Sequence, residues 1–340
     1  MADTAVKSFR SRIDAVDLAP LWDVFDLLMT REPRPRAMPA LWRYDDVRPH
    51  IIDSGSFVSA QEAVRRVLIL ENPAFRGRSR ITNTLFAGFQ LVLPGEVATA
   101  HRHSQAAARL ILEGSGAQTT VEGERITMRP GDLVLTPAWS WHEHHNESAE
   151  PVVWLDALDI PLVAYLDAGF EETGDGASQE LTRAEDDSRA RFGANLLPVQ
   201  ISHQSLSSPL HAYPYERSRE ALEKIKTTGD VDPYHGVKMR FANPLDGGHV
   251  MPTIAAFIQL LPRGMKTESC RSTEGSIFTC LEGSGTTRVG EQRLEWGPRD
   301  VFVVPGWYPV RHEAKSESVL FSFSDRGLLE KLGLWRELCA

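Results

Sequence analysis

Histidines are concentrated in one short stretch of this 340-residue chain. Five of the eleven lie between positions 101 and 145: His101, His103, His142, His144 and His145. Because His101 and His103 are two residues apart, a β-strand would direct both imidazoles to the same face, where they could share one ion. His142 is placed to supply a third ligand from a neighbouring strand. The spacing therefore predicts a metal site built from three imidazoles.

The positions around these histidines form two motifs. They are Gly95-x5-His101-x-His103 and Gly131-x5-Pro137-x4-His142-x3-Asn146. A lone histidine is more often a solvated or packed residue, but three at motif positions favour metal binding. The pair of motifs resembles the two signatures of the cupin family, whose members are small antiparallel barrels with a metal inside. Ala107 stands where that family often has a glutamate ligand, so the resemblance implies a site of three histidines. His145 is expected to face solvent.

Three neutral imidazoles leave a divalent ion its full charge and several open coordination positions. Zinc prefers four ligands and would bind a water here, which suits a hydrolase or an isomerase. Fe(II) with open neighbouring positions would suit activation of dioxygen beside a chelating substrate. A non-enzymatic cupin that binds a small anion is a further alternative. The ligands alone leave these alternatives open.

Two polar residues near the predicted ligands could bind an anionic substrate. Arg109 lies eight residues after His101 between two apolar residues, and His144 lies two residues after His142. Strand alternation can direct both toward the metal. Arginine suits a carboxylate through paired hydrogen bonds, and histidine can orient a hydroxyl or move a proton. The alternatives are a surface charge for Arg109 and simple packing for His144.

The elements that must position these residues change character along the chain. The first part predicts helices, because apolar residues recur at helical spacing over positions 18–28 and a capping pattern at positions 59–62 precedes Val64, Val67 and Leu68. From Ala87 onward, short β-rich segments such as AGFQLVL, RLILEG and VVWLD alternate with turn residues. A polar stretch at 171–190 predicts a linker, and a helix is expected over 216–226.

Two β-rich regions share a pattern. The first contains Gly95, LEGSG at 112–116, Pro130-Gly131-Asp132, Pro137, Trp139 and His144, and the second contains Gly264, LEGSG at 281–285, Pro298-Arg299-Asp300, Pro305, Trp307 and His312. This duplication predicts a mainly β bicupin with two antiparallel barrels. The expected parts are an N-terminal helical region (1–80), a metal-binding barrel (81–170), a linker and helical segment (171–250), a second barrel (251–325) and a C-terminal helix (326–340).

The second repeat lacks the metal-binding residues of the first. Aligning Gly264 with Gly95 puts Cys270 and Ser272 at the positions of His101 and His103, and Val310 replaces His142. A thiol and a hydroxyl without a third ligand make a poor site for a hard divalent ion. The second barrel is therefore expected to be metal-free, which gives one metal ion per chain.

Composition excludes several classes of partner and location. The net charge is −9 and no basic run occurs, which argues against nucleic acid and anionic membranes as partners. Apolar runs fall short of the roughly 20 residues that span a bilayer, and the start of the chain lacks the apolar core of a signal peptide, so a cytoplasmic protein is expected. The three cysteines are widely spaced and odd in number. Neither a disulfide framework nor a CxxC metal site is expected.

A longer set of segments extends the resemblance over almost the whole chain. These segments are PALWRYDDVRPHI, RRVLILENP, HRHSQAAARLILEGSGA, GDLVLTPAWSWHEHHN and WLDALDIPLV. They resemble the gentisate 1,2-dioxygenases, a bicupin family whose relatives cleave salicylate, nitrosalicylate or 1-hydroxy-2-naphthoate. The resemblance implies a homotetramer with Fe(II) on His101, His103 and His142. It also implies an aromatic 2-hydroxy acid that chelates iron and is opened by dioxygen between its carboxyl- and hydroxyl-bearing carbons. Gentisate would yield maleylpyruvate.

The same resemblance assigns roles to residues around the metal. Arg109 would anchor the substrate carboxylate and His144 would hydrogen-bond a reacting oxygen. Four further residues would line the pocket: Arg65, Phe86, Gln90 and Asp156. Arg65 is expected on a helix surface and Asp156 at a sheet edge. Phe86 stands where related sequences have tryptophan and His145 where they have glycine, so close analogues of gentisate remain alternative substrates.

Overall fold

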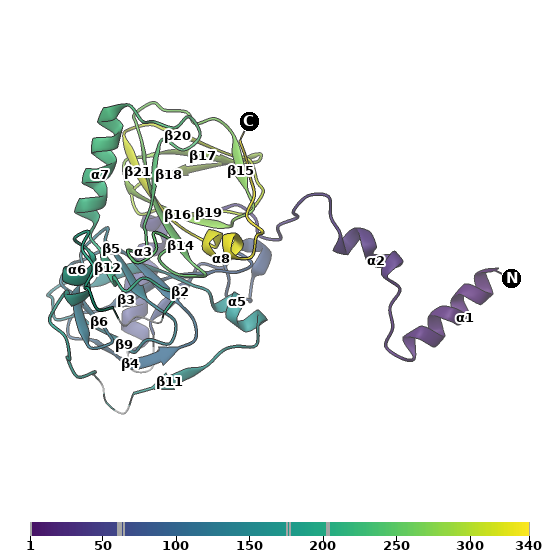
Figure 1. The fold of residues 1–340 in the computed structure, drawn as a ribbon, viewed down its shortest axis with the longest axis horizontal. Helices are drawn as coiled ribbons and strands as arrows, with labels where there is room; N and C mark the ends of the chain where they lie inside the picture. Colours follow the sequence, from purple (N-terminus) through teal and green to yellow (C-terminus); the bar gives the residue numbers. More distant parts are fainter. Residues whose placement is uncertain are drawn as a thin grey trace. The chain divides into compact units, whose positions relative to one another are not determined.

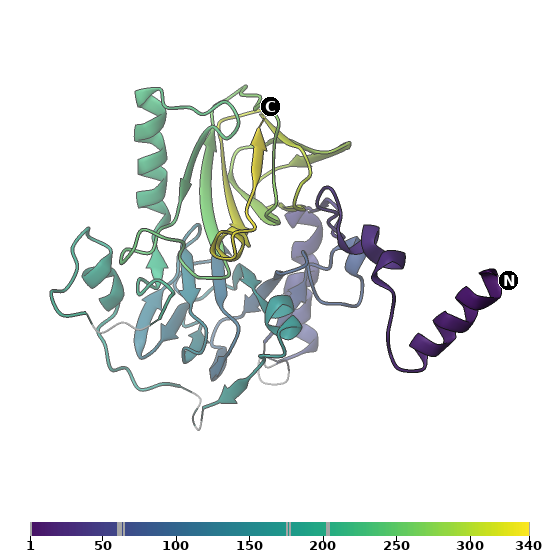
Figure 2. The same ribbon diagram turned by 45° about the vertical axis from the view of Figure 1, so that its right-hand side comes forward.

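The computed structural model describes residues 2–59, 63, 65–174, 176, 178–201 and 205–339. The chain divides into two compact units, residues 1–34 and residues 35–340. Figures 1 and 2 show the chain from two directions. No helix in the described part of the chain is long and apolar enough to cross a membrane.

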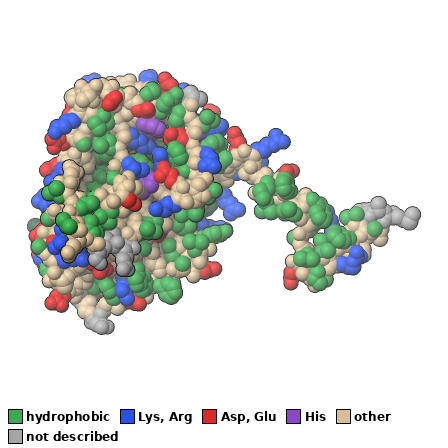
Figure 3. Space-filling view, in the orientation of Figure 1, with side chains coloured by type: hydrophobic (Ala, Val, Ile, Leu, Met, Phe, Trp, Pro, Cys, Tyr) green, Lys and Arg blue, Asp and Glu red, His purple; other side chains and the backbone are tan. Residues whose placement is uncertain are grey.

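The first unit consists of two helices, α1 (Ala2–Asp14) and α2 (Leu21–Leu28). Apolar residues at helical spacing form α2, as predicted, but none of its residues is buried. Trp22 is 71% exposed and Leu28 is 63% exposed. Apolar side chains are visible along this segment in Figure 3. Within its own unit, α2 therefore leaves apolar side chains uncovered.

The second unit contains two antiparallel barrels, each made of a six-stranded and a five-stranded sheet. The first barrel has the strand orders β12-β8-β5-β10-β3-β2 and β11-β4-β9-β6-β7. The strands of this barrel are β2 (Val67–Ile69), β3 (Phe86–Val92), β4 (Val97–His103), β5 (Ala107–Glu113), β6 (Gln118–Val121), β7 (Glu124–Thr127), β8 (Leu133–Thr136), β9 (His142–His145), β10 (Val152–Leu158), β11 (Glu171–Thr173) and β12 (Ala212–Tyr213).

The second barrel repeats this arrangement with the strand orders β1-β19-β16-β21-β14-β13 and β18-β17-β20-β15-β22. Its strands are β1 (Ala40–Trp42), β13 (Val237–Arg240), β14 (Ala255–Leu261), β15 (Cys270–Ser272), β16 (Ser276–Glu282), β17 (Gly285–Val289), β18 (Gln292–Trp296), β19 (Val301–Val304), β20 (Val310–Ala314), β21 (Ser318–Ser324) and β22 (Glu337–Cys339). The predicted bicupin fold is confirmed. In Figures 1 and 2 the blue and teal strands of the first barrel and the green and yellow strands of the second form two adjoining bodies.

Alternation along the strands separates two sets of side chains. On β5, Leu110 and Leu112 belong to a large core that also contains Ile258 and Phe321 of the second barrel. Arg109, the residue before Leu110, has the opposite orientation because successive strand residues face opposite sides of a sheet. The two six-stranded sheets thus pack together through one face, and their other faces line the barrel interiors.

Helices and short connections complete the second unit. They are α3 (Tyr44–Phe57), the 3-10 turn η1 (Pro73–Phe75), α5 (Ile160–Tyr165), α6 (Asp187–Phe192), α7 (Tyr215–Thr228) and α8 (Arg326–Lys331). The helix predicted over 216–226 is confirmed as α7, whose Leu222 is fully buried and which packs against β13 and β14. It ends at Gly229, where a φ of 86° favours glycine.

The structure corrects three expectations from the sequence. Val67 and Leu68 lie on strand β2 and not on a helix, while residues 60–62 and 64 of the predicted capping segment lie outside the described residues. The C-terminal helix ends at Lys331 and the short strand β22 follows. The expectation that the chain has no disulfide was wrong, because a disulfide bond joins Cys270 and Cys339. They are 69 residues apart in sequence but directly opposite on β15 and β22.

Candidate active site

Strand pairing brings the three candidate ligands together inside the first barrel. β4 and β9 are antiparallel neighbours with His101 opposite His142, and His103 follows two residues later on β4. One ring nitrogen from each of the three side chains lies within 4.8 Å of the others. The barrel thus gathers three imidazoles around one point, which is the arrangement that a shared metal ion requires.

Backbone hydrogen bonds set the protonation of these rings. The Nδ1 atoms of His101, His103 and His142 lie 3.2, 2.8 and 3.0 Å from the carbonyl oxygens of Thr99, Gln105 and Ser140. A carbonyl can only accept, so in the neutral rings of His103 and His142 Nδ1 carries the hydrogen and Nε2 keeps a lone pair for a metal. The Thr99 carbonyl favours the same form of His101, whose ring nitrogens are also contacted by Arg65.

Burial keeps the imidazoles neutral. It lowers the pKa of His101 to about 3 and that of His103 to about 4, and it lowers the pKa of His142 well below its usual range. The Nε2 atom of His142 is buried and has no hydrogen-bond partner among the described residues. A buried nitrogen lone pair without a donor is costly unless something binds it. The residues present therefore fit a divalent metal ion with imidazole ligands.

A cavity of about 670 Å³ opens beside the three histidines. Its size suits a small organic substrate. The predicted pocket residues Arg65, Phe86, Gln90, Arg109 and Asp156 all line it. Phe86 and Gln90 reach it because they lie on the interior face of β3, while Phe89 between them packs in the core shared by the barrels.

Arg109 and Asp156 form a buried pair in the wall of this cavity. They are directly opposite on β5 and β10, and Arg109 Nε lies 3.2 Å from Asp156 Oδ1. The contact is an ion pair, and neither of these two atoms makes a hydrogen bond within the described chain. Arg109 Nη1 donates to Thr136 Oγ1. Asp156 is on a central strand between β5 and β3, so its predicted position at a sheet edge was wrong.

Burial alters the ionisation of both groups. It raises the pKa of Asp156 to about 6 although Arg109 opposes this change, and it lowers the pKa of Arg109. The arginine nevertheless remains a cation near neutral pH. A fixed positive charge that is only partly compensated thus faces the cavity and favours an anionic ligand.

Arg65 adds a second cation near the histidines. It lies in the bend before β2, where its Nη2 donates to the carbonyl of Thr99 at 3.0 Å and contacts the ring nitrogens of His101. Its predicted place on a helix surface was wrong. β2 lies so close to β3 that a Cβ on Gly88 would be 2.5 Å from Val67 Cγ1. A glycine at position 88 thus allows the close approach of β2 that brings Arg65 to the site.

His144 lies beside the triad but does not line the cavity. Its side chain is fully buried, its ring centroid is 5.9 Å from that of His142, and its Nδ1 is 2.9 Å from Thr119 Oγ1. Nε2 has no hydrogen-bond partner within the described residues. His145 is half-buried with Nε2 3.1 Å from Glu143, so the expectation that it faces solvent holds only in part.

Other cavity residues were not identified from the sequence. Phe170 and Glu171 line the site, although the predicted linker begins at residue 171. Glu171 starts β11, which pairs with β4 so that Glu171 is opposite His103. A polar three-residue edge strand has no apolar alternation, so no local pattern could have revealed this placement.

Comparisons with known proteins agree with this geometry. The cupin domain family matches residues 88–158. The chain is 52% identical to the protein named gentisate 1,2 dioxygenase 1 of Aquipseudomonas alcaligenes, over 97% of this chain and 95% of the relative. The chain belongs to the gentisate 1,2-dioxygenase family. The predicted membership of this family of ring-cleaving enzymes is therefore confirmed.

Other gentisate 1,2-dioxygenase relatives carry different substrate names. A 5-aminosalicylate 1,2-dioxygenase of a Comamonas species is 37% identical over 98% of this chain and 92% of the relative. The crystal structure of a salicylate 1,2-dioxygenase from Pseudoaminobacter salicylatoxidans with gentisate superposes with a TM-score of 0.93 at 32% identity, covering 98% of this chain and 94% of that one. Family membership thus indicates the class of reaction but does not specify which substituents the aromatic ring of the substrate carries.

Proposed function

We propose that this protein uses dioxygen to open the ring of an aromatic 2-hydroxy acid between the carboxyl- and hydroxyl-bearing carbons. Gentisate is the proposed substrate and maleylpyruvate the product. The observation that carries the proposal is the convergence of three neutral imidazoles and two arginines on one cavity of about 670 Å³. The 52% identity to a relative named for gentisate supports this choice of substrate.

The proposed cofactor is one Fe(II) ion held by Nε2 of His101, His103 and His142. Imidazole ligands suit iron, and three of them leave positions for further ligands. Bound there, Fe(II) supplies neighbouring coordination positions for a chelating substrate and for dioxygen, together with the transfer of electrons between them. The side chains around the ion must then orient the substrate, exclude competing water and balance the negative charge of the substrate.

Arg109 is proposed to bind the substrate carboxylate. Asp156 and Thr136 hold its guanidinium at two points, so little side-chain freedom is lost when a carboxylate docks. Arg65 contributes a second positive charge to the same cavity. Because Arg65 contacts His101, its side chain must move away from that ring when a cation binds there, and the cavity is the space into which it can turn.

Apolar residues and two further polar groups complete the proposed site. Phe86, Leu158 and Phe170 line the cavity and can cover an aromatic ring, which excludes water from it. Gln90 offers an amide that can hydrogen-bond a ring hydroxyl. His144 is proposed to hydrogen-bond a reacting oxygen through Nε2, since that atom has no partner in the described chain.

Close analogues of gentisate remain a second candidate. Phe86 is part of the cavity wall, so the size of the aromatic side chain at this position determines how much space remains beside the substrate. Discrimination between rings that differ by one substituent typically amounts to about 1–3 kcal/mol in such pockets. Salicylate, 5-nitrosalicylate and 1-hydroxy-2-naphthoate therefore belong in the same test as gentisate.

Oxygen uptake tests the proposal. Anaerobic protein loaded with Fe(II) is mixed with air-saturated buffer and each of gentisate, salicylate, 5-substituted salicylates and 1-hydroxy-2-naphthoate. At least one acid should consume one dioxygen per ring opened and produce the ultraviolet absorbance of a conjugated oxo-acid. Catechol should be inert because it has no carboxylate for Arg109. Absence of oxygen uptake with the entire panel would reject ring cleavage.

The proposal also includes a cytoplasmic homotetramer. The exposed apolar side chains of α2 support self-association, because a second copy of the chain could cover them. Light scattering after size-exclusion chromatography measures the assembly, and fractionation of cells that express the protein tests the location.

A further inference from the structure

The second barrel has a small polar cavity at the position that corresponds to the candidate active site of the first barrel. Its volume is about 60 Å³, and its lining includes His235, Cys270 and Glu337. Cys270 corresponds to His101 when Gly264 is aligned with Gly95. The cavity therefore lies on the side of the second barrel that holds metal ligands in the first.

Strand pairing extends this correspondence beyond the barrel signatures. β22 pairs with β15 with Cys339 opposite Cys270 and Glu337 opposite Ser272. β11 pairs with β4 in the first barrel in the same way, with Glu171 opposite His103. Strand β22 thus occupies the place of β11, and it brings Glu337 to the cavity and Cys339 to the side of Cys270.

A third potential ligand comes from the segment before β13. β13 pairs with β14 as β2 pairs with β3, so His235 precedes β13 much as Arg65 precedes β2. Both residues lie beside the strand that carries the first ligand position, His101 in one barrel and Cys270 in the other.

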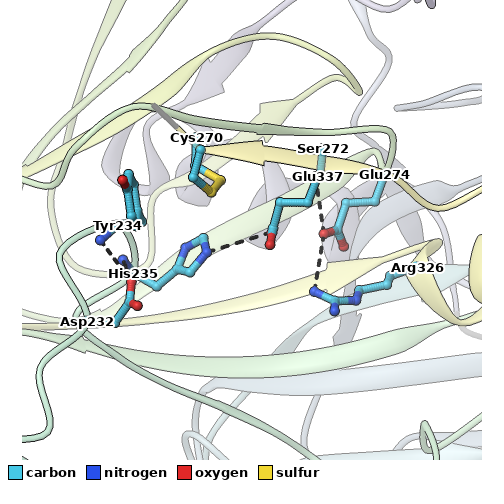
Figure 4. Close-up of a disulfide and its surroundings, with 9 residues drawn as sticks. Asp232, Tyr234, His235, Cys270, Ser272, Glu274, Arg326 and Glu337 are labelled. Carbon is cyan, nitrogen blue, oxygen red and sulfur yellow. Dashed lines mark hydrogen bonds and ion pairs between the residues drawn. A yellow bond between two sulfur atoms is a disulfide. The ribbon is translucent and has the colours of Figure 1, made fainter.

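The four side chains are close enough to share one ion. One ligand atom from each of His235, Cys270, Glu337 and Cys339 lies within 4.8 Å of the others. His235 Nε2 is 3.7 Å from Glu337 Oε1, which is too long for a hydrogen bond. Two donors around a tetrahedral zinc ion are separated by roughly 3.3–3.8 Å, given bonds of about 2.0–2.3 Å. Figure 4 shows His235 and Glu337 directed toward one another beside the cysteine pair.

The backbone of His235 is held on both sides. Its N–H donates to Asp232 Oδ1 at 2.8 Å, and its carbonyl accepts from the buried amide of Gln259 at 2.6 Å. A neighbouring carboxylate, that of Glu274, accepts hydrogen bonds from the hydroxyls of Ser272 and Ser324. The histidine is therefore preorganised, and Glu337 is the carboxylate that faces it (Figure 4).

We propose that His235, Cys270, Glu337 and Cys339 bind one zinc ion when the Cys270–Cys339 disulfide is reduced. Two thiolates, an imidazole and a carboxylate match the ligand types and the four-coordinate preference of zinc. Disulfide sulfurs cannot act as thiolates, so the oxidised and zinc-bound forms exclude one another. Reduction by a dithiol transfers two electrons and two protons to the cysteines and converts the dithiol to a disulfide. Zinc binding then releases the two thiol protons.

The proposed zinc site does not use the three positions that correspond to the histidines of the first barrel. Those positions hold Cys270, Ser272 and Val310, which cannot bind a metal ion by themselves. The proposed ligands share only Cys270 with this set, because the others come from segments outside the barrel signatures. A zinc ion at this site would link β22 to the edge of the second barrel and would take no part in ring cleavage in the first barrel.

Cobalt provides the probe, since Co(II) replaces zinc in such sites and thiolate ligands give it a charge-transfer absorption in the near ultraviolet. The iron-loaded enzyme is reduced with a water-soluble phosphine, which takes up water oxygen to become the phosphine oxide. Free thiols are counted, and Co(II) is then added. We expect one Co(II) with thiolate absorption per chain, its displacement by zinc, and no such absorption before reduction.

Variants distinguish this site from adventitious binding. Cys339→Ser should lose about half of the thiolate absorption or all of it, since one of two thiolates is removed. His235→Ala should weaken binding at least tenfold, while Cys280→Ala, which removes the buried free cysteine, should bind like wild type. Circular dichroism and ring-cleavage activity check folding. The proposal is overturned if the disulfide resists reduction in the folded enzyme, if the reduced protein gives no thiolate absorption, or if Cys280→Ala alone abolishes it.

Discussion

Replacing Arg109 by methionine tests the proposed substrate anchor most directly. Arg109 is 3% exposed, and its guanidinium contacts Thr136 and Asp156. Methionine retains a long flexible stem but removes the charge and all five donors. The substrate carboxylate then loses its proposed partner, while the three histidines keep their ligand atoms. We expect kcat/KM to fall and iron content to stay unchanged.

The size of the effect follows from the interaction that is lost. A hydrogen bond to a charged group contributes about 1.5–3 kcal/mol. At about 1.4 kcal/mol per factor of ten, this corresponds to a roughly 10- to 150-fold loss in kcat/KM. Asp156 also loses its cationic neighbour, so its pKa rises further above 6 and the carboxyl becomes protonated. Protonation limits the cost of leaving this residue buried without its partner.

An oxygen electrode measures the kinetics and elemental analysis measures the iron. Arg102→Met is a matched control, because Arg102 lies on β4 between two ligands but pairs with Glu172 outside the cavity. It should retain near wild-type kinetics. Wild-type kinetics in Arg109→Met, or an equal loss in Arg102→Met, would refute the assignment. Loss of iron in Arg109→Met would show that this residue supports the metal site instead.

Three further outcomes are expected. His142→Ala should lose its iron by elemental analysis while Ser272→Ala keeps it, and the reverse result would place the iron in the second barrel. Because the pKa of Asp156 is raised to about 6, its carboxylate can stabilise Arg109 only above that pH, so kcat/KM should decrease as the pH falls through 6. Asp156→Asn should abolish this acidic limb, and an unchanged pH profile would contradict the assignment. If α2 helps form the tetramer, protein without residues 1–34 should have a mass by light scattering below that of four shortened chains. A mass equal to four shortened chains would exclude that role.

Much of the active site could be predicted because strand alternation and the two signatures act together. His101 and His103 share a face of β4, and His142 lies opposite His101 on the next strand. The same period of two directs Arg109 and Gln90 inward from β5 and β3. These placements depend on local spacing and on a regular sheet, both of which are visible in a sequence.

The remaining site residues depend on contacts that local spacing does not encode. Arg65 reaches His101 only because β2 packs closely on β3, and Glu171 reaches the cavity through a short polar strand. The cysteine pair depends on the register of β15 with β22. The end of the chain has helical spacing of apolar residues, but Gly333 adopts a φ of 70° after α8 and the chain continues toward β22.

The two barrels show how one fold can keep its packing while its chemistry changes. Residues on one face of the six-stranded sheets pack between the barrels, so the interior face can vary without disturbing that core. Phe278 occupies the position of Arg109 and stacks on Phe302 with ring centroids 5.0 Å apart. Aromatic side chains thus fill much of the second interior, which explains why its cavity is about 60 Å³ and that of the first is about 670 Å³. A metal site in the second barrel must therefore form toward the edge, where β22 supplies ligands.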